Sequence, residues 1–403
     1  MKICFIAPKN FPVPALKGGA VETLITDFID ENEKSKKVDV DVITIYDKEA
    51  FAQSKKYCNT NFLTFKFVTG FLFKILDFFK FKQDSFGAKS INKIKAILYE
   101  KRIAHVLKKK KYDFVVTEGG HYWEYKSAYK YIPIEKSIFH IHNITEGNVF
   151  LERNYGNFIG TSKFINNKFV ENKVISNERV HLLYNGVKIE NFNKDVSLQE
   201  KKKLREKYGL KENEKTIIYC GRLVKGKGVK EVILAFKKIY RSCNAKLLIV
   251  GSPDFSIESN TDYRNELIET SKQLENYIIF TGHIYNKDLY RLYSIANIAV
   301  FPHNCDEAFG LAIVEAMSSG VPVITTNDGG IPEVIQDTDT IVLDKNSPTL
   351  VKDIAGAILR IIDNDKVLVQ MSNKGKQKAR LFSTKRYYEN YVAILNKLNN
   401  KYV

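Results

Sequence analysis

The sequence has few cysteines and no cysteine motif. The five that it contains are widely scattered, without a Cys-x-x-Cys pair or a Cys/His cluster at metal-ligand spacing, at Cys4, Cys58, Cys220, Cys243 and Cys305. We therefore expect neither a disulfide framework nor structural zinc. Proline and glycine are also sparse, with 9 and 22 among 403 residues, which excludes a collagenous or low-complexity chain.

Long hydrophobic runs and a targeting signal are missing as well. No stretch reaches the roughly 18 uninterrupted apolar residues of a membrane-spanning helix. The most apolar region, residues 62–86, is interrupted by the charged residues Lys66, Lys74, Asp77, Lys80 and Lys82. The first residues, 2–7, already resemble a strand and lack the charged and apolar regions of a signal peptide. We therefore expect a cytoplasmic protein without a membrane span.

Positive charge is plentiful and unevenly placed. The chain has 63 Lys and Arg against 46 Asp and Glu, a net charge of +17, and the segment from Phe62 to Lys111 alone holds 13 against 3. This segment also contains nine Phe between Phe62 and Phe86 and ends in the run Lys108–Lys111. Mixed aromatic and cationic residues predict peripheral docking on an anionic membrane surface, at the inner face of the cell membrane. The alternative is a solvated basic helix whose apolar residues face the core.

Nucleic acid is not an expected partner, because no helix-turn-helix, zinc-finger or RNP signature accompanies the charge. Short β-rich runs alternate instead with helical stretches along the whole chain, which predicts an α/β fold with parallel sheets covered on both faces. The expected strands are residues 2–7, 38–46, 114–118, 137–141, 157–161, 180–184, 216–220, 246–250, 278–281, 298–301, 323–326 and 340–343. We therefore expect two doubly wound, Rossmann-like domains that face a central cleft.

The best domain boundary is the turn-rich segment from Tyr184 to Val187, which a polar, Lys-rich helix follows. We predict an N-terminal domain over residues 1–186 and a C-terminal domain over 187–380. Residues 381–403 are expected to form a last helix, with apolar residues at helical spacing at Tyr387, Tyr388, Tyr391, Val392 and Leu395.

Loops that follow parallel strands are the expected place for ligands. Gly18 and Gly19 follow the first strand and allow close backbone approach at the start of a helix. In the second half, Gly221-Arg222 and Lys227-Gly228 follow a strand and resemble a clamp for a diphosphate. The chain contains neither GxGxxG nor the P-loop pattern, so dinucleotide and P-loop sites are not expected.

Two glutamates, Glu307 and Glu315, are separated by seven residues after another apolar strand. Glu307 is expected in a loop and Glu315 within the following helix, so that they face different parts of one ligand. The order of these motifs resembles the retaining, GT-B-fold glycosyltransferases of family 4, the glycosyl transferases group 1. The resemblance rests on Gly18-Gly19, His142-Asn143, Asn185-Gly186-Val187, Gly221-Arg222, Lys227-Gly228 and the pair Glu307 and Glu315, and it spans nearly the whole chain.

The resemblance implies that the N-terminal domain binds the acceptor, that the C-terminal domain binds the nucleotide-diphospho-sugar, and that the last helix crosses back to the N-terminal domain. It also implies roles for single residues. Arg222 and Lys227 would bind the diphosphate, Glu307 the transferred sugar and Glu315 the ribose, while His142 would lie beside the sugar. His142 is preferred over its neighbour His140 because His-Asn ends the strand. Further contacts to the donor would come from Gly18, Gly19, Gly221, Ile284, Phe309, Gly310 and Leu311.

The resemblance further implies retaining transfer of a sugar from a nucleotide-diphospho-sugar to a saccharide hydroxyl. No DxD-type metal site stands out at a strand end, so we expect no metal ion and no cofactor. We favour a UDP-sugar as donor and a lipid-linked acceptor in cell-surface polysaccharide, capsule or glycoconjugate synthesis. Lys188 stands where the family commonly has Asp, and Gly226 adds a glycine to the phosphate loop, so donor identity is harder to infer. The alternatives are a GT-B epimerase or phosphorylase acting on nucleotide sugars, and a catalytically silent, membrane-associated partner protein.

Overall fold

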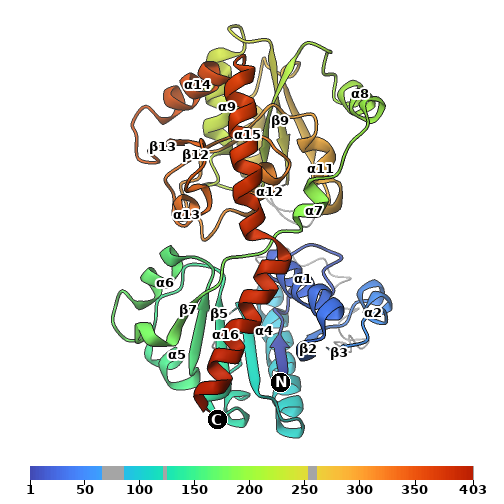
Figure 1. Cartoon of the computed structure of the whole chain (residues 1–403), viewed down its shortest axis with the longest axis vertical. Helices are drawn as coiled ribbons and strands as arrows, with labels where there is room; N and C mark the ends of the chain where they lie inside the picture. Colours follow the sequence, from blue (N-terminus) through green and yellow to red (C-terminus); the bar gives the residue numbers. More distant parts are fainter. Residues whose placement is uncertain (66–85, 121–124, 253–260, 403) are drawn as a thin grey trace. The chain divides into compact units, whose positions relative to one another are not determined.

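The computed structural model describes residues 1–65, 86–120, 125–252 and 261–402. The chain forms two compact units (Figure 1). The first unit comprises Met1–Leu183 together with Tyr387–Val403, and the second comprises Tyr184–Arg386. The second unit is thus a continuous segment that interrupts the first, and the chain returns to the first unit at Tyr387, six residues after the predicted start of the last helix.

The first unit contains a seven-stranded sheet in the order β3-β2-β1-β4-β5-β6-β7, and every adjacent pair is parallel. Its strands are β1 (Lys2–Ile6), β2 (Asp39–Ile45), β3 (Thr60–Phe65), β4 (Phe114–Glu118), β5 (Ser137–Ile141), β6 (Asn157–Gly160) and β7 (Val180–Leu182). Strand β3 is missing from the predicted set. It is a half-buried edge strand that pairs only with β2, and its polar residues break the continuous apolar run by which the central strands are recognised.

The helices of the first unit are α1 (Ala20–Ser35), α2 (Lys48–Ser54), α4 (Phe86–Lys109), α5 (Val149–Asn154), α6 (Lys163–Val170) and α16 (Thr384–Tyr402), with short 3₁₀ turns at Tyr129–Tyr131, Ile134–Lys136 and Asn177–Arg179. Helix α16 begins in the last residues of the second unit and then lies along the first (Figure 1). Its Tyr391 packs against Phe5 of β1 and Phe28 of α1, with ring centroids 5.8 and 5.0 Å away. Aromatic burial therefore joins the end of the chain to its beginning.

The second unit contains a six-stranded parallel sheet in the order β10-β9-β8-β11-β12-β13. Its strands are β8 (Lys215–Cys220), β9 (Ala245–Val250), β10 (Ile278–Gly282), β11 (Ile298–Phe301), β12 (Val323–Thr326) and β13 (Ile341–Leu343). Its helices are α7 (Ile189–Phe192), α8 (Leu198–Lys207), α9 (Val229–Ile239), α10 (Thr261–Thr270), α11 (Asn286–Tyr293), α12 (Leu311–Ser318), α13 (Ile331–Ile335), α14 (Leu350–Ile361) and α15 (Asp365–Ala379), followed by a 3₁₀ turn at Arg380–Phe382.

Both sheets are doubly wound, and this confirms the predicted fold class of two Rossmann-like α/β domains. In each sheet the strand order reverses at one place, between β1 and β4 in the first unit and between β8 and β11 in the second. Ligands of such sheets bind beyond the carboxyl ends of the strands at this reversal. The loops that follow these four strands are therefore the expected ligand-binding positions.

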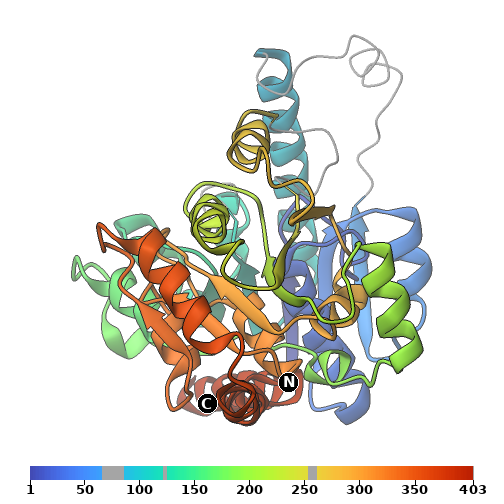
Figure 2. The ribbon, with the colours of Figure 1, turned by 90° about the horizontal axis from the view of Figure 1, so that it is seen from above.

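Residues 66–85 of the basic aromatic segment lie outside the described residues, and the described part of the segment is mainly helix α4. This helix projects from the rest of the first unit (Figure 2). Ile94, Ile97 and Leu98 are exposed on it to 47%, 43% and 38%. Of the helices within the described ranges, none combines the length and apolar content that a bilayer crossing requires.

Candidate functional site

In the second unit, the loop from β8 to α9 lies directly against the loop that follows β11. Gly228 caps α9 with a φ of 76°, and a Cβ there would collide with the backbone oxygen of Pro302. Gly226 has a φ of 84°, and a Cβ on it would lie 2.8 Å from Cys305 Cβ. Only glycine fits these two positions. The close approach places Lys227 across from the β11 loop.

Lys227 and Glu307 form an ion pair that joins these two loops. Nδ1 of His303 lies 3.7 Å from the same carboxylate oxygen. Burial favours the neutral form of Glu307, but the charge and hydrogen bond of Lys227 outweigh it and lower the pKa of the carboxyl below its ordinary value. Burial lowers the pKa of His303 to about 4, so that this imidazole is neutral at pH 7. The loops thus hold one ammonium and one carboxylate side by side.

A buried aspartate fixes the backbone that carries Glu307. Asp328 is fully buried and accepts hydrogen bonds from the backbone N–H groups of Cys305, Asp306 and Glu307 at 3.0–3.1 Å. Lys345 Nζ lies 2.6 Å from its Oδ1. Burial disfavours the charged Asp328, but these hydrogen bonds and the lysine still lower its pKa. Sequence reasoning missed this residue, although its place directly after β12 is a signal that could have indicated it.

Glu315 lies on α12, one element beyond Glu307, and has different surroundings. Gly310 caps this helix with a φ of 98°. Burial raises the pKa of Glu315 to about 7, and the Asn286 side-chain amide donates a hydrogen bond of 2.9 Å to its Oε1. Within the described residues no ion pair holds Glu315, in contrast to Glu307. The two glutamates are thus kept apart, in two different electrostatic environments.

The other predicted donor contacts of the second unit lie around these loops. Phe309 is buried against Phe382, and its neighbour Leu311 begins α12. Ile284 is partly exposed and packs on the apolar core of this unit, directly before α11. Arg222 is exposed after Gly221, and its guanidinium has no hydrogen-bond partner among the described residues. Arg222 is therefore free to bind an anion, whereas Lys227 is already paired.

In the first unit, Gly18 and Gly19 both adopt positive φ, at 91° and 90°. Gly19 caps α1, and a Cβ on it would collide with the carboxylate of Glu22. Glu22 is buried, and its carboxyl accepts hydrogen bonds from the backbone of Phe11 and from its own N–H. Burial raises its pKa to about 7 in spite of these bonds. The carboxyl of Glu22 thus lies against the glycine that was expected to approach a phosphate.

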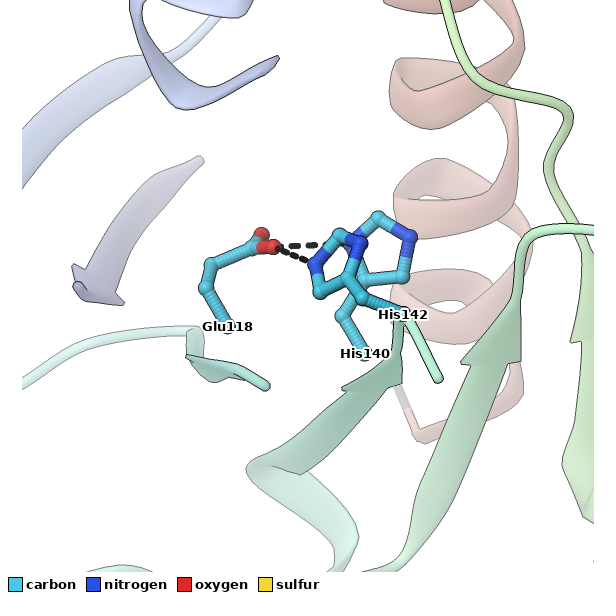
Figure 3. A group of neighbouring side chains, drawn as sticks. All are labelled: Glu118, His140 and His142. Atoms are coloured by element: carbon cyan, nitrogen blue, oxygen red, sulfur yellow. Dashed lines mark hydrogen bonds and ion pairs between the residues drawn. The ribbon is translucent and has the colours of Figure 1, made fainter. Parts of the chain in front are cut away.

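His142 belongs to a buried polar cluster at the carboxyl ends of β4 and β5 (Figure 3). Glu118 Oε2 lies 2.8 Å from His142 Nε2 and 2.9 Å from His140 Nδ1. The hydroxyl of Tyr391, on α16, donates a hydrogen bond of 3.0 Å to Glu118 Oε1. Sequence reasoning identified His142 but not Glu118, because no spacing rule connects residues on neighbouring strands.

Glu118, His140 and His142 are also the types of residue that bind transition metals, and their ligating atoms all lie within 4.8 Å of one another. A metal ion would require both facing imidazole nitrogens to be unprotonated. His140 would then carry its proton on Nε2, which is buried and has no hydrogen-bond partner among the described residues. Histidine ligands normally donate this second N–H to a partner. The cluster therefore fits a hydrogen-bonded network better than a metal centre.

Comparison with solved structures defines the fold. The chain superimposes on a glycosyltransferase from Rickettsia africae with a TM-score of 0.77, at 19% identity and over 98% of both chains. It is likewise similar to the Anabaena protein Alr3699/HepE in complex with UDP-glucose, with a TM-score of 0.73 at 18% identity over 98% of this chain and all of that one. The fold is the GT-B architecture of two Rossmann-like domains.

Residues 200–378 match the family model of the glycosyl transferases group 1. The chain is 34% identical to an uncharacterized glycosyltransferase of Methanocaldococcus jannaschii over 178 residues, which are 44% of each protein. It thus matches less than half the length of that relative. It is 25% identical to the putative glycosyltransferase YtcC of Bacillus subtilis over all of this chain and 94% of that protein.

Proposed function

We propose that this protein is a glycosyltransferase that moves a sugar from a nucleotide-diphospho-sugar to a hydroxyl of a saccharide acceptor. The ion pair of Lys227 and Glu307 carries the proposal, because it lies where the strand order of the second sheet reverses. The match of residues 200–378 to the group 1 family supports it. A neighbour of the same fold in complex with UDP-glucose makes a UDP-sugar the first donor to test.

In this proposal, the bound donor breaks the ion pair of Lys227 and Glu307 and gives each of the two side chains a new partner. Lys227 turns from Glu307 to the diphosphate, and the exposed Arg222 adds a second cation with a planar fork of donors. Glu307 then accepts hydrogen bonds from hydroxyls of the transferred sugar. Asp328 holds the Glu307 backbone in place for this role by accepting a hydrogen bond from the Glu307 N–H. Before the donor arrives, each charge of the pair offsets the burial cost of the other.

We further propose that transfer retains the anomeric configuration. The bond between the anomeric carbon and the diphosphate breaks, the acceptor oxygen bonds to the same face of that carbon, and its proton passes to an oxygen of the departing phosphate. Arg222 and Lys227 stabilise the negative charge that develops on this leaving group. Two side-chain cations provide the neutralisation that a divalent metal gives in other transferases, so the proposed reaction needs no metal ion or cofactor.

For the acceptor, we propose a lipid-linked saccharide that the first unit binds at an anionic membrane surface, as in cell-surface polysaccharide synthesis. Helix α4 supports this because its exposed side chains form one face, with Ile94 and Leu98 followed by the exposed Lys101 and Lys108 at helical spacing. Apolar residues can enter the headgroup boundary while the lysines contact anionic lipids, at about 1 kcal/mol each.

Calorimetry with UDP-, GDP-, ADP- and dTDP-glucose tests the donor site directly. We expect one nucleotide to bind the wild type, and Lys227→Met to weaken this binding at least about tenfold, since it removes a charge-assisted contact. Lys230→Met is the matched control, because Lys230 is also ion-paired, 2.6 Å from Glu266, but its side chain is 39% exposed compared with 17% for Lys227. Equal affinity in both variants would contradict the assignment.

Product analysis separates transfer from the other reactions of the same fold. The nucleotide sugar that binds is incubated with a saccharide acceptor and, separately, without one. We expect a glycosylated product and free nucleoside diphosphate only in the presence of acceptor. Formation of an isomerised nucleotide sugar without acceptor would indicate an epimerase and not a transferase. Donor binding without turnover of any acceptor would indicate a catalytically silent partner protein.

A further inference from the structure

The polar cluster around His142 contains two residues that no motif indicated, Glu118 and Tyr391. Glu118 is 1% exposed, yet its carboxyl is ionised, because the two histidines and their hydrogen bonds outweigh burial and lower its pKa. An ionised carboxylate can only accept hydrogen bonds. Each group that contacts it must therefore be the donor, which fixes where the protons of the neighbouring rings lie.

This constraint determines the tautomer of His142. Its Nε2, 2.8 Å from Glu118 Oε2, carries the proton and donates it to the carboxylate. Burial, reinforced by the nearby His140, lowers the pKa of His142 to about 4, so the ring carries a single proton at neutral pH. Nδ1 is therefore unprotonated and can accept a hydrogen bond. No protein group among the described residues bonds to this nitrogen, and it is not among the fully enclosed polar atoms that lack a partner.

The ring of His142 is also fixed in orientation. Gly119, with a φ of 62°, lies along one ring edge, where a Cβ would be 3.2 Å from His142 Cδ2. On the other side lies the ring of His140, with a centroid separation of 4.0 Å. The ring of Tyr391 in turn packs on His140 at 5.7 Å. A ring flip about the Cβ–Cγ bond would place Cε1 where Nε2 lies and would lose the hydrogen bond to Glu118.

We propose that Glu118 and Tyr391 are positioning residues that present His142 to the substrate as a neutral ring whose Nδ1 accepts a hydrogen bond from a sugar hydroxyl. Tyr391 acts by donating to Glu118 Oε1, which leaves Oε2 for the two imidazoles. The inference rests on the proposed sugar transfer for its substrate. It makes His142 a hydrogen-bond acceptor for a sugar hydroxyl and not a cation that would bind the diphosphate.

Long-range ¹H–¹⁵N NMR of the full chain labelled at its histidines reads the tautomer without any assay of activity. The chain has seven histidines, and His142→Gln assigns the signal. We expect the wild type to show His142 protonated at Nε2 only, and Glu118→Gln to lose this single tautomer because an amide can both donate and accept. A protonated Nδ1 in the wild type would overturn the proposal. So would Zn²⁺ that shifts His140 and His142 at one equivalent, because a metal ion needs both facing nitrogens unprotonated.

Kinetics show whether this tautomer matters for transfer. We expect Glu118→Gln and Tyr391→Phe to lower kcat roughly 10- to 100-fold, the scale of a misoriented catalytic contact, with unchanged affinity for the free nucleoside diphosphate. Tyr388→Phe is the matched control, because it removes a buried hydrogen bond of the same helix, 2.8 Å to Asn32, without touching Glu118. It should leave kcat unchanged.

A double-mutant comparison separates positioning from a merely structural role. If Glu118 acts through His142, then Glu118→Gln should lower kcat little further in a chain that already carries His142→Gln. A full additional loss there would contradict the proposal. If the wild type transfers no sugar at all, the proposed function fails, and the NMR result still decides whether Glu118 fixes the ring.

Discussion

The raised pKa of Glu315 predicts that donor binding releases a proton. In the free protein, burial holds this pKa at about 7, compared with an ordinary 4.5. The groups next to the Glu315 carboxyl carry no positive charge that would lower this pKa again. The Asn286 amide is neutral, and burial raises the pKa of the Cys220 thiol to about 12. If ribose hydroxyls donate to the Glu315 carboxylate, binding selects the ionised form and lowers the pKa again.

The magnitude follows from the two pKa values. If binding restores a pKa of about 4.5, the complex forms with release of about 0.9 proton at pH 6, about 0.5 at pH 7 and about 0.1 at pH 8. Ionising the Glu315 carboxyl costs free energy below pH 7, and this cost reduces the binding free energy. Affinity at pH 6 should therefore be about tenfold lower than at pH 8, or about 1.4 kcal/mol.

Calorimetry in two buffers with different enthalpies of ionisation measures the released protons directly. The nucleotide sugar itself is the ligand to use, because its disubstituted diphosphate stays fully ionised over this range, whereas a free nucleoside diphosphate titrates. Glu315→Gln should bind with no proton release and with an affinity that is flat between pH 6 and pH 8. Proton release that is the same in the variant and the wild type would refute the role of Glu315.

Three further predictions concern stability and docking. Burial raises the pKa of Glu22 from 4.5 to about 7. The native state therefore loses up to about 3 kcal/mol of stability as the pH rises from about 4.5 to 7. A thermal-shift series from pH 5 to 8 should show this loss in the wild type and a smaller loss in Glu22→Gln. Gly329→Ala should destabilise the second unit by about 2 kcal/mol in urea unfolding, since its φ is 53° and a Cβ would collide with the backbone of the β11–α12 loop, and an unchanged midpoint would contradict the tight approach. In the Lys108–Lys111 run, Lys110 pairs with a buried aspartate at 2.7 Å and is therefore kept. Replacing the other three lysines by Gln should weaken sedimentation with anionic vesicles, while donor binding is retained. If Gln at residues 201–203 causes the same loss, only the net charge matters.

The sheets could be predicted because their central strands are buried on both faces and therefore have continuous apolar runs, such as Leu247–Val250. Helix and strand order followed from this alternation. The edge strand β3 could not be predicted, since a half-buried strand shares its polar composition with loops. The glycines were recognisable as loop signals, but only the structure shows that Gly226 and Gly228 allow two loops to touch.

The charged residues of the candidate site were easier to find than their supports. Lys227 and Glu307 lie within recognisable motifs, and the structure joins them. Asp328 and Glu118 have no motif of their own. Their hydrogen-bond partners identify them. Asp328 accepts from a loop that lies 21–23 residues earlier in the chain, and Glu118 contacts a histidine on the neighbouring strand. A sequence shows that a carboxylate is present, but the groups that donate to it depend on which strand ends the fold places together.

The path of the chain also affects how the protein is made. Because α16 provides Tyr391 to the core of the first unit, that unit lacks part of its interior until residues 384–402 have left the ribosome. The second unit is continuous from Tyr184 to Arg386 and can complete its fold earlier during translation. A nascent chain interrupted before residue 387 would leave the apolar face around Phe28 uncovered. In incomplete chains, we therefore expect chaperones and proteases to act on the first unit, whose residues 1–183 are synthesised before the second unit.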